Sequence, residues 1–569
     1  MKKRWMRLPA LLLAVLLTGC TAPEVITQGG KTVPTTMPTT TTTLQPQAPT
    51  VPTVTPDGYA VAPMQYPGAA VQTLEDRGLV LFSMVGRTVG EATYQGNRHF
   101  KGTNLIVSPY FTAQIDEVPL PVYATPVYVA TDSHGALHSF ASVDVAFGSR
   151  ETVRLTLTVA ESVSCETAQV FSDDPAVLTL QGKEIALDVS AHGVYTVVLD
   201  DDQDYAFTLF VRTYRDEERE IADYQARYGA DHVRVFEPGI HEIDYLQIGS
   251  DSVLYLKAGA ILLPRHTFDI QDDAAAASTS EPNASKSNGI GLNRFPVVNG
   301  YAGSNMVIAG RGTVDMTQLD WHERRGIVFT LCQNATMDGV IIVNPCEWAF
   351  ITYRCENVSV TQSAVLGYRT NSDAFAICNS IDVQVTDCFA RTGDDMFEVK
   401  TLGGVDTAVS RDITFRRCQA WGSKARCFGV IGEIEKDVSN ILFEDGIVIF
   451  RDATWDNNRI GSLVVLRESG NGKVSGVTFR NMTIHYDAGR AIQVGVYGAH
   501  LTDSRMENIV FENVSYHAKM HSQIRINAGA GNVLRVALKN VTANGMLMTL
   551  RNYMEFFYCD QEGLLSILS

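Results

Sequence analysis

The chain has 569 residues, of which 45% are hydrophobic and 19% charged, and its formal net charge is −17. The apolar content is that of a folded protein of several hundred residues. The excess of acidic side chains opposes binding to a phosphate backbone, so we expect no nucleic-acid partner. It also disfavours a strongly polyanionic substrate, unless a local basic patch overrides the overall field.

The N-terminus has the parts of an export signal. Four cations at residues 1–7 precede the apolar run Leu11–Leu17, which is far shorter than the roughly 20 residues that cross a bilayer. The run leads into Leu17-Thr-Gly-Cys20, which resembles the bacterial lipobox. That resemblance implies removal of residues 1–19 as a lipoprotein signal peptide and diacylation of Cys20. The protein would then be extracytoplasmic and lipid-anchored at the bacterial cell surface. An ordinary secretory signal with an incidental cysteine is the alternative.

Cysteine usage argues against a disulfide framework. Ten cysteines are present, and assigning Cys20 to lipid leaves an odd number that cannot all pair within one chain. Most of the others lie in or beside hydrophobic strand patterns, and we interpret them as small buried apolar side chains. No cysteine or histidine spacing indicates a metal site, and we expect neither a metal nor a cofactor.

Residues 20–62 are dominated by Thr and Pro, with five consecutive threonines from Thr39 to Thr43. Such a segment cannot bury enough apolar surface to order itself. We predict a disordered stalk that holds the folded part of the protein away from the membrane.

Alternating apolar side chains mark the segment that follows. The pattern is clearest at Val153, Leu155, Leu157 and Val159, and again at Tyr205, Phe207, Leu209 and Val211. Period-two runs separated by Gly, Asp and Ser clusters are typical of an antiparallel sandwich, so we predict a β-sandwich domain over residues 63–214. Residues 215–228 have a helix-compatible composition and are expected to cover the first coil of the next domain, where pairing edges would otherwise be exposed.

A short strand-like unit, usually Asn or Asp followed by apolar-x-apolar, recurs through the C-terminal part. It begins at Asn305, Asn357, Asp382, Asp412, Asn440, Gly476 and Asn508, and from Asn357 the intervals are 25, 30, 28, 36 and 32 residues. At roughly 3.3 Å per strand residue, one interval accommodates a coil of three short strands, and the uneven lengths indicate loops growing from a constant coil. We predict an all-β protein in which a right-handed parallel β-helix spans residues 215–569, with a disordered insert at 272–290.

Three acidic residues are spaced to meet on neighbouring coils. Asp373 and Asp394 are 21 residues apart, close to one coil, and Asp395 follows directly. Three carboxyls within a few ångströms cannot all ionise freely, so at least one pKa should rise. Glycosidic hydrolysis needs such a pair of states, a protonated acid for the leaving oxygen and an ionised base for water.

Other interpretations of the same acids are open. Asp and Asn are common in β-helix turns because their side chains hydrogen-bond the backbone, and an acidic trio can hold calcium, as in pectate lyases with this coil. The alternatives to a hydrolase are therefore a calcium-dependent polysaccharide lyase and a non-catalytic surface glycan-binding protein.

The segments around these acids resemble a known family. Asn371-Ser-Asp373 and Gly393-Asp-Asp-Met-Phe-Glu-Val-Lys400 are similar to the Asn-Thr-Asp and Gly-Asp-Asp motifs of the polygalacturonases, glycoside hydrolase family 28, and of the related dextranase and isopullulanase family 49. Upstream, Asn344-Pro-Cys-Glu-Trp348 is similar to an element of bacterial members. The resemblance covers about residues 70–520. It implies an inverting hydrolase of a polysaccharide or oligosaccharide, with Asp394 as general acid, Asp373 and Asp395 positioning and deprotonating the water, and a wide gap between opposing carboxyls.

Two departures from the family bear on the substrate. The chain has no Gly-His-Gly motif and no histidine between His322 and His485, and the match to the uronate-binding Arg-Ile-Lys motif is Arg459-Ile-Gly461, without the lysine. Homogalacturonan is therefore a doubtful substrate, and a neutral α-glucan, a galactoside or a substituted pectic side chain remain open. Besides the catalytic acids, the candidate substrate-binding residues are Asn371, Lys400, Arg426, Trp348 and Arg459. Lys400 and Arg426 could instead be solvated surface charges, and Trp348 could be a sugar platform or a core residue.

Overall fold

The computed structural model describes residues 105–127, 136–147, 151–174, 176–267, 296–403, 408–422, 425–451 and 460–568, together with the backbone of three short strands within residues 42–61. The predicted signal peptide, Cys20, the insert at 272–290 and Arg459 lie outside these ranges. Within the predicted stalk, β1 (Thr42–Thr43) pairs with β16, β2 (Thr53–Val54) with β3 (Tyr59–Val61), and β3 with β8. No helix in the described ranges is long and apolar enough to cross a membrane.

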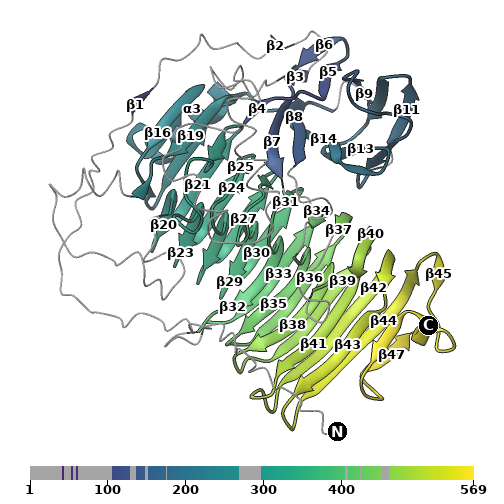
Figure 1. Ribbon diagram of the computed structural model, residues 1–569. Helices are drawn as coiled ribbons and strands as arrows, with labels where there is room; N and C mark the ends of the chain where they lie inside the picture. The colour runs from purple at the N-terminus through teal and green to yellow at the C-terminus, as the bar shows by residue number, and fades with distance from the viewer. Residues whose placement is uncertain are drawn as a thin grey trace, which may run out of the picture.

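The C-terminal part is the predicted right-handed parallel β-helix, and Figure 1 shows its coils stacked from teal to yellow. Each coil contributes strands to a 23-stranded sheet that bends around two sides and to an 11-stranded sheet on the third. The strands of the 11-stranded sheet are β17 (Leu246–Ile248), β20 (Val298–Tyr301), β23 (Ile327–Thr330), β26 (Phe350–Tyr353), β29 (Phe375–Cys378), β32 (Phe397–Thr401), β35 (Phe428–Ile434), β38 (Leu463–Ser469), β41 (Ile492–Gly498), β43 (Ser522–Ala528) and β46 (Phe557–Cys559).

The larger sheet alternates the other two strands of each coil. After β1 they are β15 (Val233–Phe236), β16 (Gly239–Ile243), β18 (Ser252–Leu256), β19 (Ala260–Pro264), β21 (Ser304–Gly310), β22 (Thr313–Asp315), β24 (Gln333–Asp338), β25 (Ile341–Val343), β27 (Glu356–Thr361), β28 (Ala364–Leu366), β30 (Ile381–Thr386), β31 (Phe389–Arg391), β33 (Ser410–Arg416), β34 (Gln419–Gly422), β36 (Val438–Glu444), β37 (Ile447–Arg451), β39 (Val474–Arg480), β40 (Thr483–Arg490), β42 (Arg505–Met520), β44 (Val533–Ala543), β45 (Met546–Leu547) and β47 (Leu565–Leu568). Two short 3₁₀ turns complete the described elements, η2 (Ala230–His232) and η3 (Tyr553–Glu555).

The recurring Asn or Asp of the sequence pattern is a left-handed backbone position in every coil where it occurs. Asn305, Asn357, Asp382, Asp412, Asn440 and Asn508 have φ between 54° and 57°, and Gly476 has φ 66°. Asn and Asp tolerate this conformation better than other L-residues, and glycine adopts it freely. Their side chains also bond across coils, as Asn334 does to Asn305 at 3.0 Å and Asn357 to Asn334 at 2.7 Å. The repeat is therefore a turn signal with a structural cause.

Inside the coils, aromatic side chains stack along the axis. Phe415, Phe443, Phe479 and Phe511 have ring centroids 5.0, 4.7 and 4.8 Å apart and planes within 9° of parallel. The spacing matches the distance between neighbouring strands, so the same inward position is filled in four successive coils. Burying each such side chain contributes about 1.5–3 kcal/mol.

The N-terminal domain is the predicted β-sandwich. Its two sheets order as β10-β13-β14-β8-β3-β2, with β7 joining β4 to β8, and as β11-β12-β9-β5-β6. Pairing is antiparallel except between β8 and β14. Its remaining strands are β4 (Ile106–Val107), β5 (Phe111–Ile115), β6 (Val118–Leu120), β7 (Tyr123–Val127), β8 (Ala136–Val145), β9 (Val153–Val159), β10 (Ala168–Phe171), β11 (Val177–Gln181), β12 (Glu184–Val189), β13 (Gly193–Leu199) and β14 (Asp202–Thr213). In β9 the predicted face, Val153 to Val159, is buried at alternate positions.

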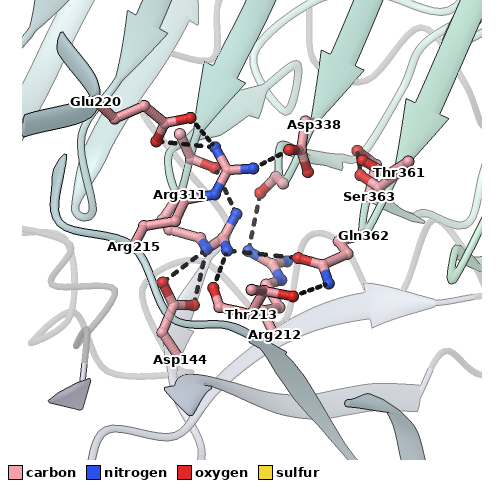
Figure 2. A network of polar contacts seen from close by, with 12 residues as sticks. Asp144, Arg212, Thr213, Arg215, Glu220, Arg311, Asp338, Thr361, Gln362 and Ser363 are labelled. Carbon is pink, nitrogen blue, oxygen red and sulfur yellow. Dashed lines mark hydrogen bonds and ion pairs between the residues drawn. The ribbon is translucent and has the colours of Figure 1, made fainter. Parts of the chain in front are cut away.

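The sandwich docks against the solenoid through a mixed apolar and ionic interface. Phe140 and Phe210 of the sandwich share one buried cluster with Phe389 and Trp421 of the coils. Beside it, Asp144 accepts two hydrogen bonds from Arg311, at 2.8 and 3.1 Å (Figure 2). The sheet that contains β8 and β14 is therefore the one that packs against the coils.

The described helix, α3 (Glu217–Tyr228), forms where a helix was predicted. Asp216 caps it by accepting the Arg219 N–H at 3.1 Å, a typical N-cap arrangement. Its buried Ile221 packs with Val233 and Val253, on the outer face of the first coils.

Candidate active site

The turns that precede β29 and β32 carry the three predicted acids on adjacent coils. Phe375 of β29 pairs with Phe397 of β32, and the Ala374 N–H donates to the Asp395 carbonyl at 2.9 Å. This register places Asp373 against Asp394 and Asp395. One carboxylate oxygen from each of the three acids lies within 4.8 Å of one from each of the others, so the one-coil spacing brings the acids together.

Asp394 is the most open of the three, because Asp373 and Asp395 are only 3% and 2% exposed whereas Asp394 is half-buried. Its two carboxylate oxygens are oriented by backbone N–H groups, from Asn371 at 2.9 Å and from Asp395 at 3.0 Å. Asn371 has φ 60°, a left-handed conformation that Asn tolerates. The contact of Asn371 with the trio is through its backbone.

Asp395 is held by Arg426 from the next coil. The Arg426 backbone N–H donates to Oδ1 at 3.0 Å and its Nη1 to Oδ2 at 3.0 Å, so both oxygens are fixed. A second carboxylate, Glu468, lies 3.5 Å from Arg426 Nη2. Burial opposes the charge of Arg426, but Asp395 and Glu468 outweigh it and raise the pKa of the guanidinium. Arg426 is therefore an internal counter-ion of the trio.

Asp373 belongs to a second buried group with Glu398 and Lys400. In β32, Phe397 and Val399 point into the core, so Glu398 and Lys400 project from the outer face, as alternation in a strand requires. Lys400 Nζ lies 3.0 Å from Glu398 Oε2 and 3.4 Å from Asp373 Oδ2. Sequence reasoning missed Glu398, although its position between two apolar residues of the Gly393–Lys400 segment was a usable signal.

The pKa values of this group follow from its burial. Burial and the neighbouring Glu398 raise the pKa of Asp373 well above its usual range, against the opposing effect of Lys400. Burial likewise raises the pKa of Glu398 to about 8, with Lys400 opposing. The carboxylates around Lys400 outweigh its burial and raise its pKa, so the ammonium stays charged.

Trp348 is half-buried at the surface of the same sheet. The Lys400 ammonium lies 4.5 Å and the Arg325 guanidinium carbon 5.4 Å from its ring centroid, both within cation–π range. Arg325 in turn pairs with Glu347 at 3.2 Å. The predicted residues Trp348, Asn371, Lys400 and Arg426 thus lie around the trio, whereas Arg459 is outside the described residues.

A second group of possible ligand atoms lies in an earlier part of the solenoid. Oxygen and nitrogen atoms of His266, Asp320 and Glu323 approach within 4.8 Å of one another. His266 Nδ1 is 3.0 Å from Glu323 Oε2, and burial of Glu323 is outweighed by that contact and by two N–H donors, which lower its pKa. This group is internally paired and was not predicted from the sequence.

The nine described cysteines are free thiols, and seven are buried: Cys332, Cys346, Cys355, Cys378, Cys388, Cys418 and Cys427. This confirms their interpretation as small core residues. Cys332 and Cys355 lie on adjacent coils. The residues that follow them, Gln333 and Glu356, pair with each other in the parallel ladder of β24 and β27.

Comparison with known proteins supports the fold and identifies a related family. Residues 291–554 match the family model described as glycosyl hydrolases family 28. Among solved structures, Dex49A from Penicillium minioluteum aligns with a TM-score of 0.53 at 10% identity, over 82% of this chain and 95% of that one. At this identity the likeness concerns the fold.

Two polygalacturonases are also similar. A hyperthermoactive exopolygalacturonase from Thermotoga maritima aligns over 58% of this chain and 88% of its own, with a TM-score of 0.41 and 14% identity. The polygalacturonase of Erwinia carotovora ssp. carotovora aligns over 60% and 88%, with a TM-score of 0.41 and 15% identity. No curated protein matches the sequence. On the family match, this chain is a glycoside hydrolase, and its residues 291–554 resemble family 28.

Proposed function

We propose that this protein is an inverting glycoside hydrolase that cleaves O-glycosidic bonds in an extracellular polysaccharide or oligosaccharide, with the Asp trio as acid and base. The observation that carries the proposal is the convergence of Asp373, Asp394 and Asp395 within 4.8 Å. Hydrolysis needs an acid at the leaving oxygen and a base at the attacking water. Asp394, the most open acid, faces the leaving oxygen, Asp395 deprotonates the water and Asp373 positions it.

Inversion is supported by the burial of two of the acids. Carboxyls this close together are typical of retaining enzymes, which use one of them as a nucleophile on the sugar. However, Asp373 and Asp395 are almost fully buried, and both oxygens of Asp395 are held by Arg426. A carboxylate fixed in this way can bond a small water molecule but cannot approach an anomeric carbon. Proton NMR of the first product should therefore show the anomer opposite to that of the substrate.

The test of the acid is Asp394→Asn, which should lower turnover by several orders of magnitude and leave thermal stability nearly unchanged. Asp382→Asn is the matched control, because Asp382 is an exposed turn aspartate with φ 54°, a conformation that Asn also adopts. The control should keep wild-type turnover. Full activity of Asp394→Asn would refute the assignment. Release of products with a new ultraviolet-absorbing double bond, abolished by a chelator, would indicate a lyase instead.

We also propose that the sugar at the cleavage point is uncharged. Among the described residues, the cations nearest to the trio are already paired: Lys400 and Arg426 have side chains only 6% and 7% exposed and each contacts at least two carboxylates. Within the part of the site that the structure describes, a uronate would meet an excess of carboxylates, and both of these cations are already engaged by carboxylates of the protein. Reducing ends should appear from neutral α-glucans or galactosides and not from homogalacturonan; the reverse result would contradict this substrate class.

Finally, we propose that the enzyme is displayed at the bacterial cell surface through a lipid on Cys20. The support is the Leu-Thr-Gly-Cys sequence after a cationic and apolar leader. Two acyl chains on one N-terminal cysteine are enough to hold a protein at a membrane without a spanning helix. Cys20→Ala should move the protein from the membrane fraction to the medium. Retention of the variant in the membrane fraction would argue against the anchor.

A further inference from the structure

The group formed by Asp373, Glu398 and Lys400 is not electrically balanced if both acids are ionised. Glu398 is completely buried and Asp373 is 3% exposed, while the Lys400 side chain is 6% exposed. Two carboxylates and one ammonium would leave one negative charge among side chains that are almost completely buried. Such a charge is costly, and a buried group of this kind reaches neutrality by keeping a proton.

A carboxylate oxygen of Glu398 is also available to accept a hydrogen bond from a protonated carboxyl group of Asp373. Lys400 Nζ lies 3.0 Å from its Oε2, whereas its Oε1 has no hydrogen-bond partner among the described residues. A buried acceptor without a donor costs about 1–3 kcal/mol. A proton on Asp373, directed at Glu398, would satisfy this acceptor.

The neighbours decide which of the two acids carries the proton. Glu398 is closer to Lys400 than Asp373 is, at 3.0 Å against 3.4 Å, so the ammonium favours ionisation of Glu398. Asp373 instead faces Asp395, the proposed base, within 4.8 Å, and the like charge of an ionised Asp395 favours the protonated form of Asp373. The proton therefore belongs on Asp373.

We propose that Glu398 is a positioning residue for hydrolysis: ionised and paired with Lys400, it accepts a hydrogen bond from the protonated carboxyl of Asp373. The second oxygen of Asp373 then accepts a hydrogen bond from the attacking water without competing for its proton, and Asp395 is left as the base. This inference rests on the proposed hydrolase function. It assigns a role to a residue that the family resemblance did not include.

The charge environment agrees with this assignment. Burial and Glu398 raise the pKa of Asp373 well above its ordinary value, whereas the rise that burial causes in the pKa of Glu398 is opposed by Lys400. The two carboxyls titrate as a pair, and the proton is held on Asp373. The other charged groups that face the pair are Asp394, Asp395, Lys400 and, through Lys400, Glu433 at 3.7 Å. Arg426 bonds Asp395 and is the remaining cation beside the trio. The pair should thus keep one proton throughout the neutral range and lose it only in alkali.

The pH dependence of kcat/KM tests the role of Glu398. In the wild type, loss of the shared proton should produce an alkaline limb at about pH 8 or above. Glu398→Gln removes the like charge, and its amide N–H stabilises an ionised Asp373, so the alkaline limb should move to lower pH by about one unit or more. An alkaline limb that stays in place, or that moves to higher pH, would overturn the inference.

Glu433→Gln is the matched control, since Glu433 also contacts Lys400 but its side chain is 47% exposed. Water screens its charge, so its removal should leave the limb where it is. If Asp394→Asn abolishes turnover while Glu398→Gln leaves the limb unmoved, the hydrolase proposal stands and only the role of Glu398 fails. If Asp394→Asn is fully active, the hydrolase proposal itself fails.

If Glu398→Gln does not fold, infrared spectroscopy of the wild type and of a second variant tests the inference instead. Infrared difference spectra between the wild type and Asp373→Asn should show the carbonyl band of a protonated carboxylic acid at pH 7, which disappears in alkali. The difference is needed because burial also raises the pKa of Asp173 to about 8 and of Glu217 to about 7. Absence of the band at pH 7 would show that Asp373 is ionised and refute the inference without any substrate.

Discussion

Removing the Asp144 carboxylate should weaken the attachment of the sandwich to the solenoid by a predictable amount. Asp144 and Arg311 have side chains only 4% and 2% exposed, and Asp144 accepts two hydrogen bonds from the guanidinium. Arg311 would keep the Thr213 carbonyl at 2.9 Å but would lose its counter-ion. Leaving one buried charge unpaired costs about 3–5 kcal/mol.

The expected signal for Asp144→Ala is therefore a large fall in stability. For a cooperative unit of about 150–250 residues, each kcal/mol shifts the melting temperature by about 2–4 °C, so calorimetry should show a midpoint at least roughly 6 °C lower. The double variant Asp144→Ala with Arg311→Met should be more stable than the single one, because it contains no unpaired buried charge. A single variant that loses less than about 1 kcal/mol, or a double variant that is less stable than either single one, would refute the reasoning.

Two further predictions concern positions away from the candidate active site. Gly476 occupies, at φ 66°, a turn position that Asn440 and Asn508 occupy at φ 55° in other coils; Gly476→Asn should keep nearly wild-type stability, whereas Gly476→Val should lose about 1–2 kcal/mol in denaturant unfolding because a β-branched residue is strained there. Equal stability of the two variants would contradict the turn argument. Burial raises the pKa of Glu217 to about 7, although the Ala258 N–H opposes this shift, while the unfolded value is about 4.3. Because the folded state binds this proton more tightly, protonation of Glu217 stabilises the fold; this contribution to the unfolding free energy is complete below about pH 4 and is lost as the pH rises towards 7. Glu217→Gln should flatten the fall in unfolding free energy across that window. An unchanged slope would show that Glu217 does not titrate as inferred.

The solenoid could be predicted because its signals are local. The residues that begin each repeat, such as Asn357 and Asn440, have left-handed φ values, and the preference of Asn for this conformation depends little on the rest of the chain. Intervals of one coil then place Asp373 beside Asp394 and Asp395, since stacked coils bring equivalent turns together. The alternation in β9 predicted a sandwich face for the same local reason.

The ionic partners could not be predicted in this way. Arg426 reaches Asp395 from 31 residues further along the chain, Glu468 joins Arg426 from a later coil, and Arg311 pairs with Asp144 across 167 residues. No local pattern in the sequence encodes which charged side chains of different coils meet, because the loops between coils differ in length.

What the sequence determined by itself, then, is the coil, its turns and the meeting of three acids, because strand period and turn conformation are properties of a few adjacent residues. Only the tertiary structure decided the charge environment of those acids: it buried Glu398 completely, placed Lys400 beside it and paired Arg426 with Asp395. The physical reason is that ionisation depends on burial and on every charge nearby, and both are set by contacts between distant parts of the chain.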